Sequence, residues 1–171
     1  MMKKAFQWIL LLIGGQASAQ AELETVPYVD LQRYLGKWYD IASFPQRFQK
    51  GCSCTTAEYG LNKDGSITVT NRCMKEGKEK TATAKAVVKD KNSNAKLSVQ
   101  FFWPFKGKYW IIDLADDYSY AVVGHPSRDY LWILSRKPQI PDATYEKILS
   151  RIKAKGYDLS RLKKTEQTCT P

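Results

Sequence analysis

Residues 81–89 read TATAKAVVK, a stretch in which small apolar residues alternate with longer or polar ones. This period of two is typical of a β-strand with one face in water and the other against an apolar interior. Lys85 faces water, so Ala82, Ala84 and Ala86 face inward. Three small inward side chains leave space beside the strand. Side chains from other strands fill that space, or it stays open as a hydrophobic pocket.

Similar short runs lie on both sides of this stretch, and turn signals separate them about every eight to twelve residues, the spacing of an all-β sandwich or barrel. They predict seven further strands, at residues 36–44, 52–61, 66–73, 95–103, 108–114, 118–124 and 129–136. The pair Asp64-Gly65 predicts a hairpin turn, because both residues tolerate positive φ. With residues 81–89 the count is eight, enough for a closed barrel that can hold one small ligand.

One helix is predicted after the strands. It begins at Pro141-Asp142 and ends at Gly156, and its apolar stripe consists of Tyr145, Ile148, Leu149 and Ile152. The last three strands are apolar on both faces, as strands covered by a helix must be. The predicted fold is therefore all-β: an eight-stranded antiparallel up-and-down barrel with one C-terminal α-helix packed on its outside.

The N-terminus has the pattern of a secretory signal peptide. Lys3 and Lys4 precede the apolar run 5–15, and Ala17-Ser18-Ala19 supplies the small residues of a cleavage site. We therefore predict a signal peptide over residues 1–19 and one mature domain over residues 20–171. Gln20 stands where a lipoprotein has its cysteine. We expect an exported protein that is not lipid-anchored, in the periplasm or cell envelope or secreted.

Four cysteines lie in the exported part of the chain: Cys52, Cys54, Cys73 and Cys169. Because export leads to an oxidising compartment, the sequence favours two disulfides, although spacing alone leaves all three pairings open. A zinc site is disfavoured, since one residue separates Cys52 from Cys54 and the single histidine is remote in sequence. We expect no metal.

Charge and composition exclude further classes of function. The composition, 43% hydrophobic and 26% charged, is that of a globular protein. The net charge is +10, and loss of Lys3 and Lys4 leaves +8. That charge favours contact with an anionic membrane surface, whereas export argues against nucleic acid. The chain has no nucleophile elbow, phosphate loop or zinc helix motif, so we expect no enzyme and no catalytic residues.

Two segments resemble the lipocalin family, in its bacterial lipocalin and apolipoprotein D branch. Residues 34–42, YLGKWYDIA, contain the G-x-W pattern of that family, and residues 129–138, DYLWILSRKP, are similar to the final strand of the branch. The resemblance covers the whole mature chain. It implies a barrel whose narrow end is closed by Gly36, Trp38 and Arg136. The Trp38 side chain plugs this end, and Arg136 stacks across its indole ring. It also implies the disulfides Cys54–Cys169 and Cys52–Cys73.

The resemblance further implies a binding protein for fatty acids, lysophospholipids or similar lipids, which it transports or stores in the barrel interior. The implied pocket residues are Phe44, Ala57, Tyr59, Ala84, Ala86, Val99, Phe101, Trp103, Tyr109 and Trp132. No cofactor is implied, and we expect a monomer or weak homodimer. Arg47, Lys106 or Arg128 could meet a charged head group. The alternatives are a protein that binds haem or another hydrophobic cofactor, and a lipocalin-fold enzyme that uses His125.

Overall fold

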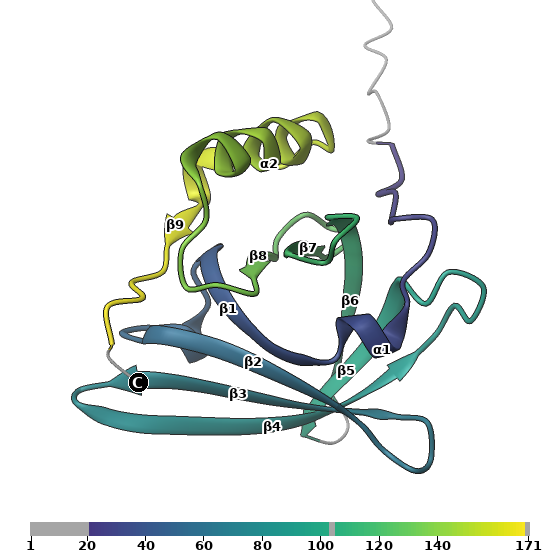
Figure 1. Cartoon of the computed structure of the whole chain (residues 1–171), viewed down its shortest axis with the longest axis horizontal. Helices are drawn as coiled ribbons and strands as arrows, with labels where there is room; N and C mark the ends of the chain where they lie inside the picture. The colour runs from purple at the N-terminus through teal and green to yellow at the C-terminus, as the bar shows by residue number, and fades with distance from the viewer. Residues whose placement is uncertain (1–20, 103–104, 170–171) are drawn as a thin grey trace, which may run out of the picture.

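A computed structural model of the chain describes residues 21–102 and 105–169, without the side chains of residues 101, 102 and 105. Its barrel strands are β1 (Gly36–Ser43), β2 (Ser53–Leu61), β3 (Ile67–Lys75), β4 (Lys78–Val88), β5 (Lys96–Phe102), β6 (Phe105–Leu114), β7 (Tyr120–Gly124) and β8 (Leu131–Ser135). Each strand pairs antiparallel with the next, and β1 pairs with both β2 and β8. The sheet is therefore closed (Figure 1), which confirms the predicted eight-stranded barrel.

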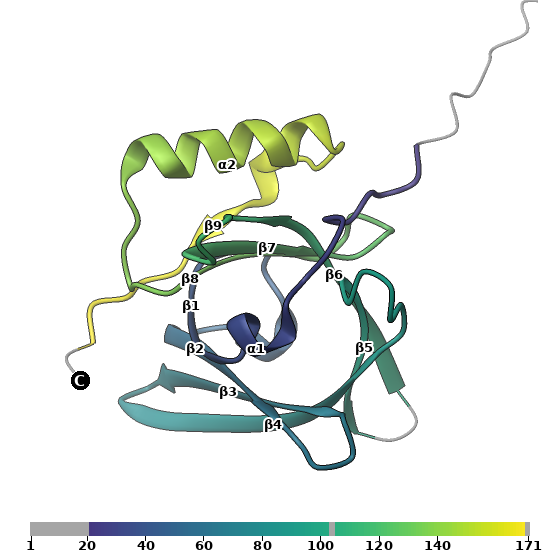
Figure 2. The same ribbon diagram turned by 45° about the vertical axis from the view of Figure 1, so that its right-hand side comes forward.

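The long helix α2 (Asp142–Ala154) lies on the outside of the barrel, as predicted (Figure 2). Tyr145, Ile148 and Ile152 are buried on its inner face. In the described ranges, no helix is long and apolar enough to cross a membrane.

The strand bounds depart from the prediction mainly where strands project beyond the core. β3 continues to Lys75, and β4 begins at Lys78. Glu76 and Gly77 form the turn between them, and both have a positive φ. Residues 78–83 of β4 are all exposed, so the predicted inward position of Ala82 is wrong: this part of the strand projects beyond the core and has no buried face. β7 begins two residues later than predicted, because Tyr118 takes a positive φ in the preceding turn.

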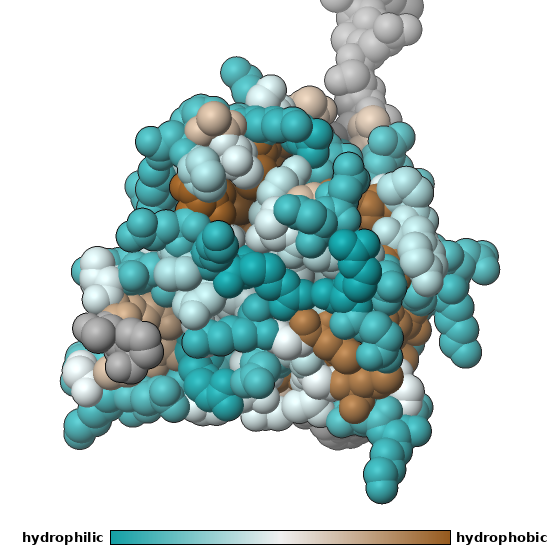
Figure 3. Space-filling view, in the orientation of Figure 1, coloured by the Kyte–Doolittle hydropathy of each residue, from teal (hydrophilic) through white to brown (hydrophobic). Residues whose placement is uncertain are grey.

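Two hydrophobic cores share the wall of the barrel. The inner core lies inside the barrel and draws on β1 to β8 and the segment before them. The outer core lies between α2 and the outward faces of β1, β6, β7 and β8. These strands are buried on both faces, which explains their continuous apolar character. Figure 3 shows apolar surface beneath α2 and mostly hydrophilic residues around it.

Two short elements were not predicted. Helix α1 (Leu31–Tyr34) is capped by the Asp30 carboxylate, which accepts hydrogen bonds from the backbone N–H groups of Gln32 and Arg33. Figure 2 shows α1 lying across one end of the barrel. Strand β9 (Lys163–Lys164) belongs to the C-terminal tail and pairs with the end of β1.

The tail connects β1 to β2 where those strands no longer pair. The side-chain amide of Gln167 donates to the backbone oxygens of Asp40 and Thr55, and the Cys54 N–H donates to the Glu166 carbonyl. The structure contains both implied disulfides, Cys54–Cys169 and Cys52–Cys73. The first ties the tail to β2 across 115 residues, a loop length at which a cross-link contributes about 4–5 kcal/mol in the chain-entropy model.

Trp38 and Arg136 close the end of the barrel at which α1 lies. The Trp38 ring is fully buried, its N–H donates to the Tyr34 carbonyl at 2.8 Å, and the Arg136 guanidinium carbon lies 3.7 Å from the ring centroid. Arg136 also donates to the carbonyls of Lys37 and Arg33. Gly36 starts β1 with a φ of +88°, a conformation that L side chains rarely adopt.

We predict that Arg136→Met lowers the free energy of unfolding by about 2–4 kcal/mol. The variant keeps an apolar stem, but it loses the cation–π contact and two charge-assisted hydrogen bonds. Urea unfolding followed by tryptophan fluorescence measures the change. Lys137→Met, at the exposed neighbouring position, is the control and should stay within about 0.5 kcal/mol of the wild type. Equal losses in the two variants would contradict the assigned role.

Candidate functional site

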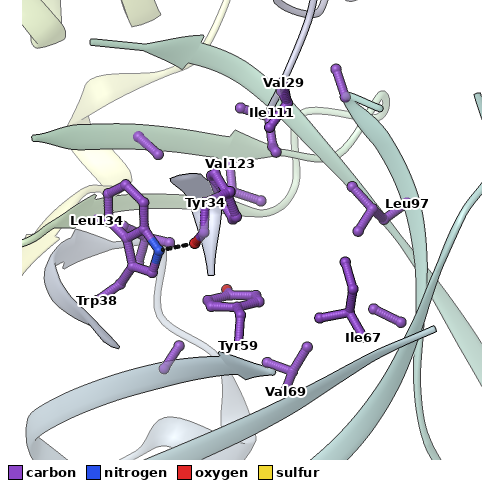
Figure 4. Close-up of a cluster of buried hydrophobic side chains, with 14 of the residues drawn as sticks. Val29, Tyr34, Trp38, Tyr59, Ile67, Val69, Leu97, Ile111, Val123 and Leu134 are labelled. Atoms are coloured by element: carbon purple, nitrogen blue, oxygen red, sulfur yellow. Dashed lines mark hydrogen bonds between the residues drawn. The ribbon is translucent and has the colours of Figure 1, made fainter. Parts of the chain in front are cut away.

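The inner core brings apolar side chains from opposite walls of the barrel together in its interior. In Figure 4 the labelled side chains point toward one another from the strands around the barrel and from the segment that carries Val29 and Tyr34. Ala84 and Ala86 of β4 lie on one wall of this space. These two side chains occupy less of the interior than the larger side chains of the facing strands. The interior is therefore the candidate site for an apolar molecule.

Seven of the ten pocket residues implied by the resemblance belong to the inner core or pack against it. Ala57, Tyr59, Ala84 and Ala86 are buried in the inner core, and Val99, Tyr109 and Trp132 are partly buried against it. Trp103 and the side chain of Phe101 lie outside the described residues. The inner core also contains residues that were not singled out as lining a pocket: Ile67, Val69, Leu97, Ile111, Val123 and Leu134. Alternation in residues 66–73 could have revealed Ile67 and Val69.

Phe44 does not lie in the interior, and its predicted position there is wrong. It is fully buried in the outer core, where its ring packs edge-on against Tyr157 and the Arg161 guanidinium carbon lies 4.6 Å from its centroid. The pairing of β1 with β8 shifts register between Asp40 and Ala42. One irregularity of this kind reverses the faces of all later residues in a strand, so Phe44 turns outward.

Three tyrosine hydroxyls form the polar part of the inner core. The Tyr109 hydroxyl lies 2.7 Å from that of Tyr34 and 2.8 Å from that of Tyr59. Burial raises the pKa of all three, that of Tyr59 to about 12, so each keeps its proton at neutral pH. Three hydroxyls have three protons and share two hydrogen bonds, so one donor is left over for another acceptor, such as water or a ligand oxygen.

Asp40 is the buried carboxyl group of β1, and it was not predicted as a site residue. It is 3% exposed, and its Oδ2 accepts hydrogen bonds from the Ser43 hydroxyl and the Gln49 amide at 3.2 and 3.4 Å. Its Oδ1 is buried without a hydrogen-bond partner. Burial raises the pKa of Asp40 to about 6, although the neighbouring polar side chains of Ser43, Thr165 and Gln49 lower it.

Gln49 links this carboxyl to the inner core, because its side-chain oxygen accepts a hydrogen bond from the Trp132 N–H at 3.3 Å. Gln49 belongs to a 3-10 turn, Arg47–Gln49, in the loop that joins β1 to β2. A polar network therefore runs from the loop to both β1 and β8. No alternation or motif reveals it, since the loop determines which side chain meets Asp40.

His125 lies in the turn after β7, where local bonds hold its ring. Its Nδ1 accepts the Ser127 N–H at 3.1 Å and lies 2.8 Å from the Ser127 hydroxyl. Burial lowers its pKa, so the neutral form dominates at pH 7. Within residues 21–102 and 105–169, no three His, Cys, Asp or Glu side chains gather in a way that could hold a metal ion.

The three basic side chains proposed for a head group have different surroundings. Arg128 donates to the backbone oxygens of Lys155, Pro126 and Ala21, so it ties the turn after β7 to the end of α2 and to the N-terminal segment. Lys106 is exposed near the start of β6. Arg47 is exposed in the loop that carries Gln49 and lines the cavity beside Asp40.

Residues 29–167 match the family model of the lipocalin-like domain. The chain is 43% identical over 159 residues to temperature-induced lipocalin-1 of Arabidopsis thaliana, covering 88% of this chain and 86% of that one. It is 37% identical over 155 residues to outer membrane lipoprotein Blc of Vibrio cholerae, covering 89% and 91%. Its identity to bovine apolipoprotein D is 32% over 152 residues, covering 83% and 79%. These relatives confirm the expected branch.

The fold also matches that of insecticyanin from the tobacco hornworm Manduca sexta, with a TM-score of 0.70 at 20% identity and 86% coverage of both chains. One expectation is contradicted. The Blc relatives are named outer membrane lipoproteins, so the prediction of an exported protein without a lipid anchor, drawn from Gln20, is wrong. The predicted signal peptide, residues 1–19, lies outside the described residues.

We predict that Asp40→Asn changes how stability depends on pH. Folding raises the pKa of Asp40 from 3.8 to about 6, so the folded state holds this proton more tightly and stability falls as the pH rises from about 4 to about 6. The ionised carboxyl therefore costs the folded state about 3 kcal/mol at pH 7 relative to pH 4.

Urea unfolding of the wild type and Asp40→Asn near pH 4 and pH 7 measures this difference. The free energy of unfolding of Asp40→Asn minus that of the wild type should increase by about 3 kcal/mol from pH 4 to pH 7. Asp116→Asn, an exposed position with the same chemical change, should show no such gain. A wild type and Asp40→Asn with parallel pH profiles would rule out the raised pKa.

Proposed function

This chain belongs to the lipocalin family, and from that premise we propose that it binds a fatty acid, a lysophospholipid or a similar lipid in the interior of its barrel, for transport or storage. Lipocalins typically bind small hydrophobic ligands. The observation that carries the proposal is the apolar interior wall, on which the buried side chains of β4 are the small residues Ala84 and Ala86, with Val88 partly buried beside them. An acyl chain that enters this space gains about 0.8 kcal/mol per buried methylene.

We propose that the ligand contacts seven of the side chains that the resemblance implied: Ala57, Tyr59, Ala84, Ala86, Val99, Tyr109 and Trp132. The alanines leave room for an acyl chain, and the larger side chains enclose it. The surplus hydroxyl proton of the tyrosine cluster offers a hydrogen bond to one polar atom of the ligand.

We also propose that the protein acts by binding and catalyses no reaction. His125 has Ser127 as its polar partner in the turn, and no carboxylate hydrogen-bonds its ring among the described residues. A general base needs an oriented partner of that kind. Haem binding is a weaker alternative, because Nδ1 accepts the Ser127 N–H and the proton of the neutral ring therefore lies on Nε2, the atom left to bind iron.

The proposal is tested by titrating the purified protein with a fluorescent fatty acid while tryptophan emission is recorded. Trp38 and Trp132 belong to or border the inner core, so a bound ligand should quench them saturably. Mass spectrometry of lipids that co-purify with the protein identifies the natural ligand class. Absence of both saturable quenching and co-purified lipid would overturn the proposal.

We predict that Ala86→Phe weakens fatty acid binding by about tenfold or more, because the added ring occupies the space meant for the acyl chain. The unfolding free energy should fall by less than about 1 kcal/mol, since an open interior accepts the ring without overpacking. Val87→Phe adds the same ring on the outward face, where Val87 is 42% exposed, and should leave binding unchanged.

The same pair of variants tests whether the interior is open. In an interior filled by side chains, Ala86→Phe would cost about 1–3 kcal/mol of stability while Val87→Phe would cost little. That result, together with unchanged ligand affinity, would exclude the barrel interior as the site.

A further inference from the structure

A cavity of about 630 Å³ lies between the loop after β1 and the C-terminal tail. Its walls are the end of β1, residues 45–47 and 49–52, Thr55 of β2 and residues 163–166. It forms where β1 has left β2 and the tail has taken the place of the missing strand pairing. Gln49 lines the cavity and also accepts the N–H of Trp132, a side chain that packs against the inner core.

Asp40 is the buried carboxyl group in the wall of this cavity. It can accept about four hydrogen bonds, but only Oδ2 has donors, and Oδ1 has none. A buried carboxylate oxygen without a donor costs stability. A protein that keeps such a group beside a cavity therefore has an acceptor to offer to a hydrogen-bond donor from outside the chain.

The charges around the cavity indicate which kind of ligand group can donate a hydrogen bond to Asp40. Arg47 and Lys50 line it from the loop, and Lys163, Lys164 and Glu166 line it from the tail. On the interior side, Tyr59 is the titratable group whose pKa Asp40 influences, and it stays protonated. Four cations against Glu166 and Asp40 disfavour an ammonium group. A carboxylate or phosphate has no proton to donate to Oδ1, whereas a hydroxyl group donates without adding charge.

We propose that this cavity is the head-group subsite for an amphiphile with free hydroxyl groups, such as a glycerol head, and that Asp40 accepts a hydrogen bond from one of them. The inference rests on the proposed binding of an acyl chain in the barrel interior, because Gln49 in the cavity wall contacts Trp132, which packs against the inner core. Asp40 thereby selects hydroxyl-bearing lipids over lipids with the same chain and no donor.

The test compares two uncharged ligands, monooleoylglycerol and methyl oleate, which share an acyl chain and differ in the free hydroxyls. Each displaces a fluorescent fatty acid from the wild type, from Asp40→Asn and from Asp116→Asn. The wild type should prefer monooleoylglycerol by about tenfold or more, the value of a hydrogen bond to a charged group. Asp40→Asn should reduce this preference by about tenfold, and Asp116→Asn should keep it.

The preference should also depend on pH, because neither ligand ionises and Asp40 does. It should weaken when the pH is lowered from about 7.5 to about 5, and Asp40→Asn should remove this dependence. The pH profile distinguishes a hydrogen bond to Asp40 from a change in the shape of the cavity.

Two outcomes overturn the inference, and they are distinguishable. If both ligands bind all three proteins with equal affinity, acyl binding stands and the role of Asp40 is wrong. If neither ligand displaces the fluorescent probe and the probe itself does not bind, the proposed function fails and the head-group subsite fails with it.

Discussion

The stacking of Arg136 on Trp38 is the contact on which the rest of the barrel depends. The indole is fully buried, and its N–H and the guanidinium together bind three backbone carbonyls, those of Tyr34, Lys37 and Arg33. These bonds hold α1 and the start of β1 against Arg136, the residue that follows β8. A barrel open at this end would admit water to the apolar side chains of the inner core.

The second constraint is that part of the wall must be apolar on both faces. β6, β7 and β8 contribute to the inner core on one side and to the outer core on the other, where α2 covers them. The outer core is built from large side chains such as Ile112, Ile133 and Ile148, and carries much of the packing energy. The helix therefore stabilises the wall from outside, so the interior can use small residues such as Ala84 and Ala86 without making the barrel unstable.

Asp40 shows the opposite balance between stability and function. Its burial raises its pKa to about 6, and an ionised carboxyl at this position destabilises the folded protein at neutral pH. The loop residue Gln49, Ser43 and the tail hold the group in place but leave one oxygen unpaired. The C-terminal tail, attached by the Cys54–Cys169 bridge, forms the facing wall of the cavity. The disulfide thus supports the arrangement around Asp40, whose Oδ1 is buried without a hydrogen-bond partner.

The sequence by itself determined the barrel, the outer helix and most of the interior wall, because a period of two in strands and an apolar helix stripe are local patterns. The same patterns placed Ala84, Ala86 and Trp132 inside. Only the tertiary structure decided the position of Phe44, since the register shift in β1 that turns it outward depends on pairing with β8. The ends of β3 and β4, and the joining of Asp40 to Gln49 and the tail, were equally beyond sequence reasoning. Contacts between segments more than a hundred residues apart, such as Gln167 with Asp40, leave no periodic signal in the chain, because they depend on where closure of the barrel brings its two ends.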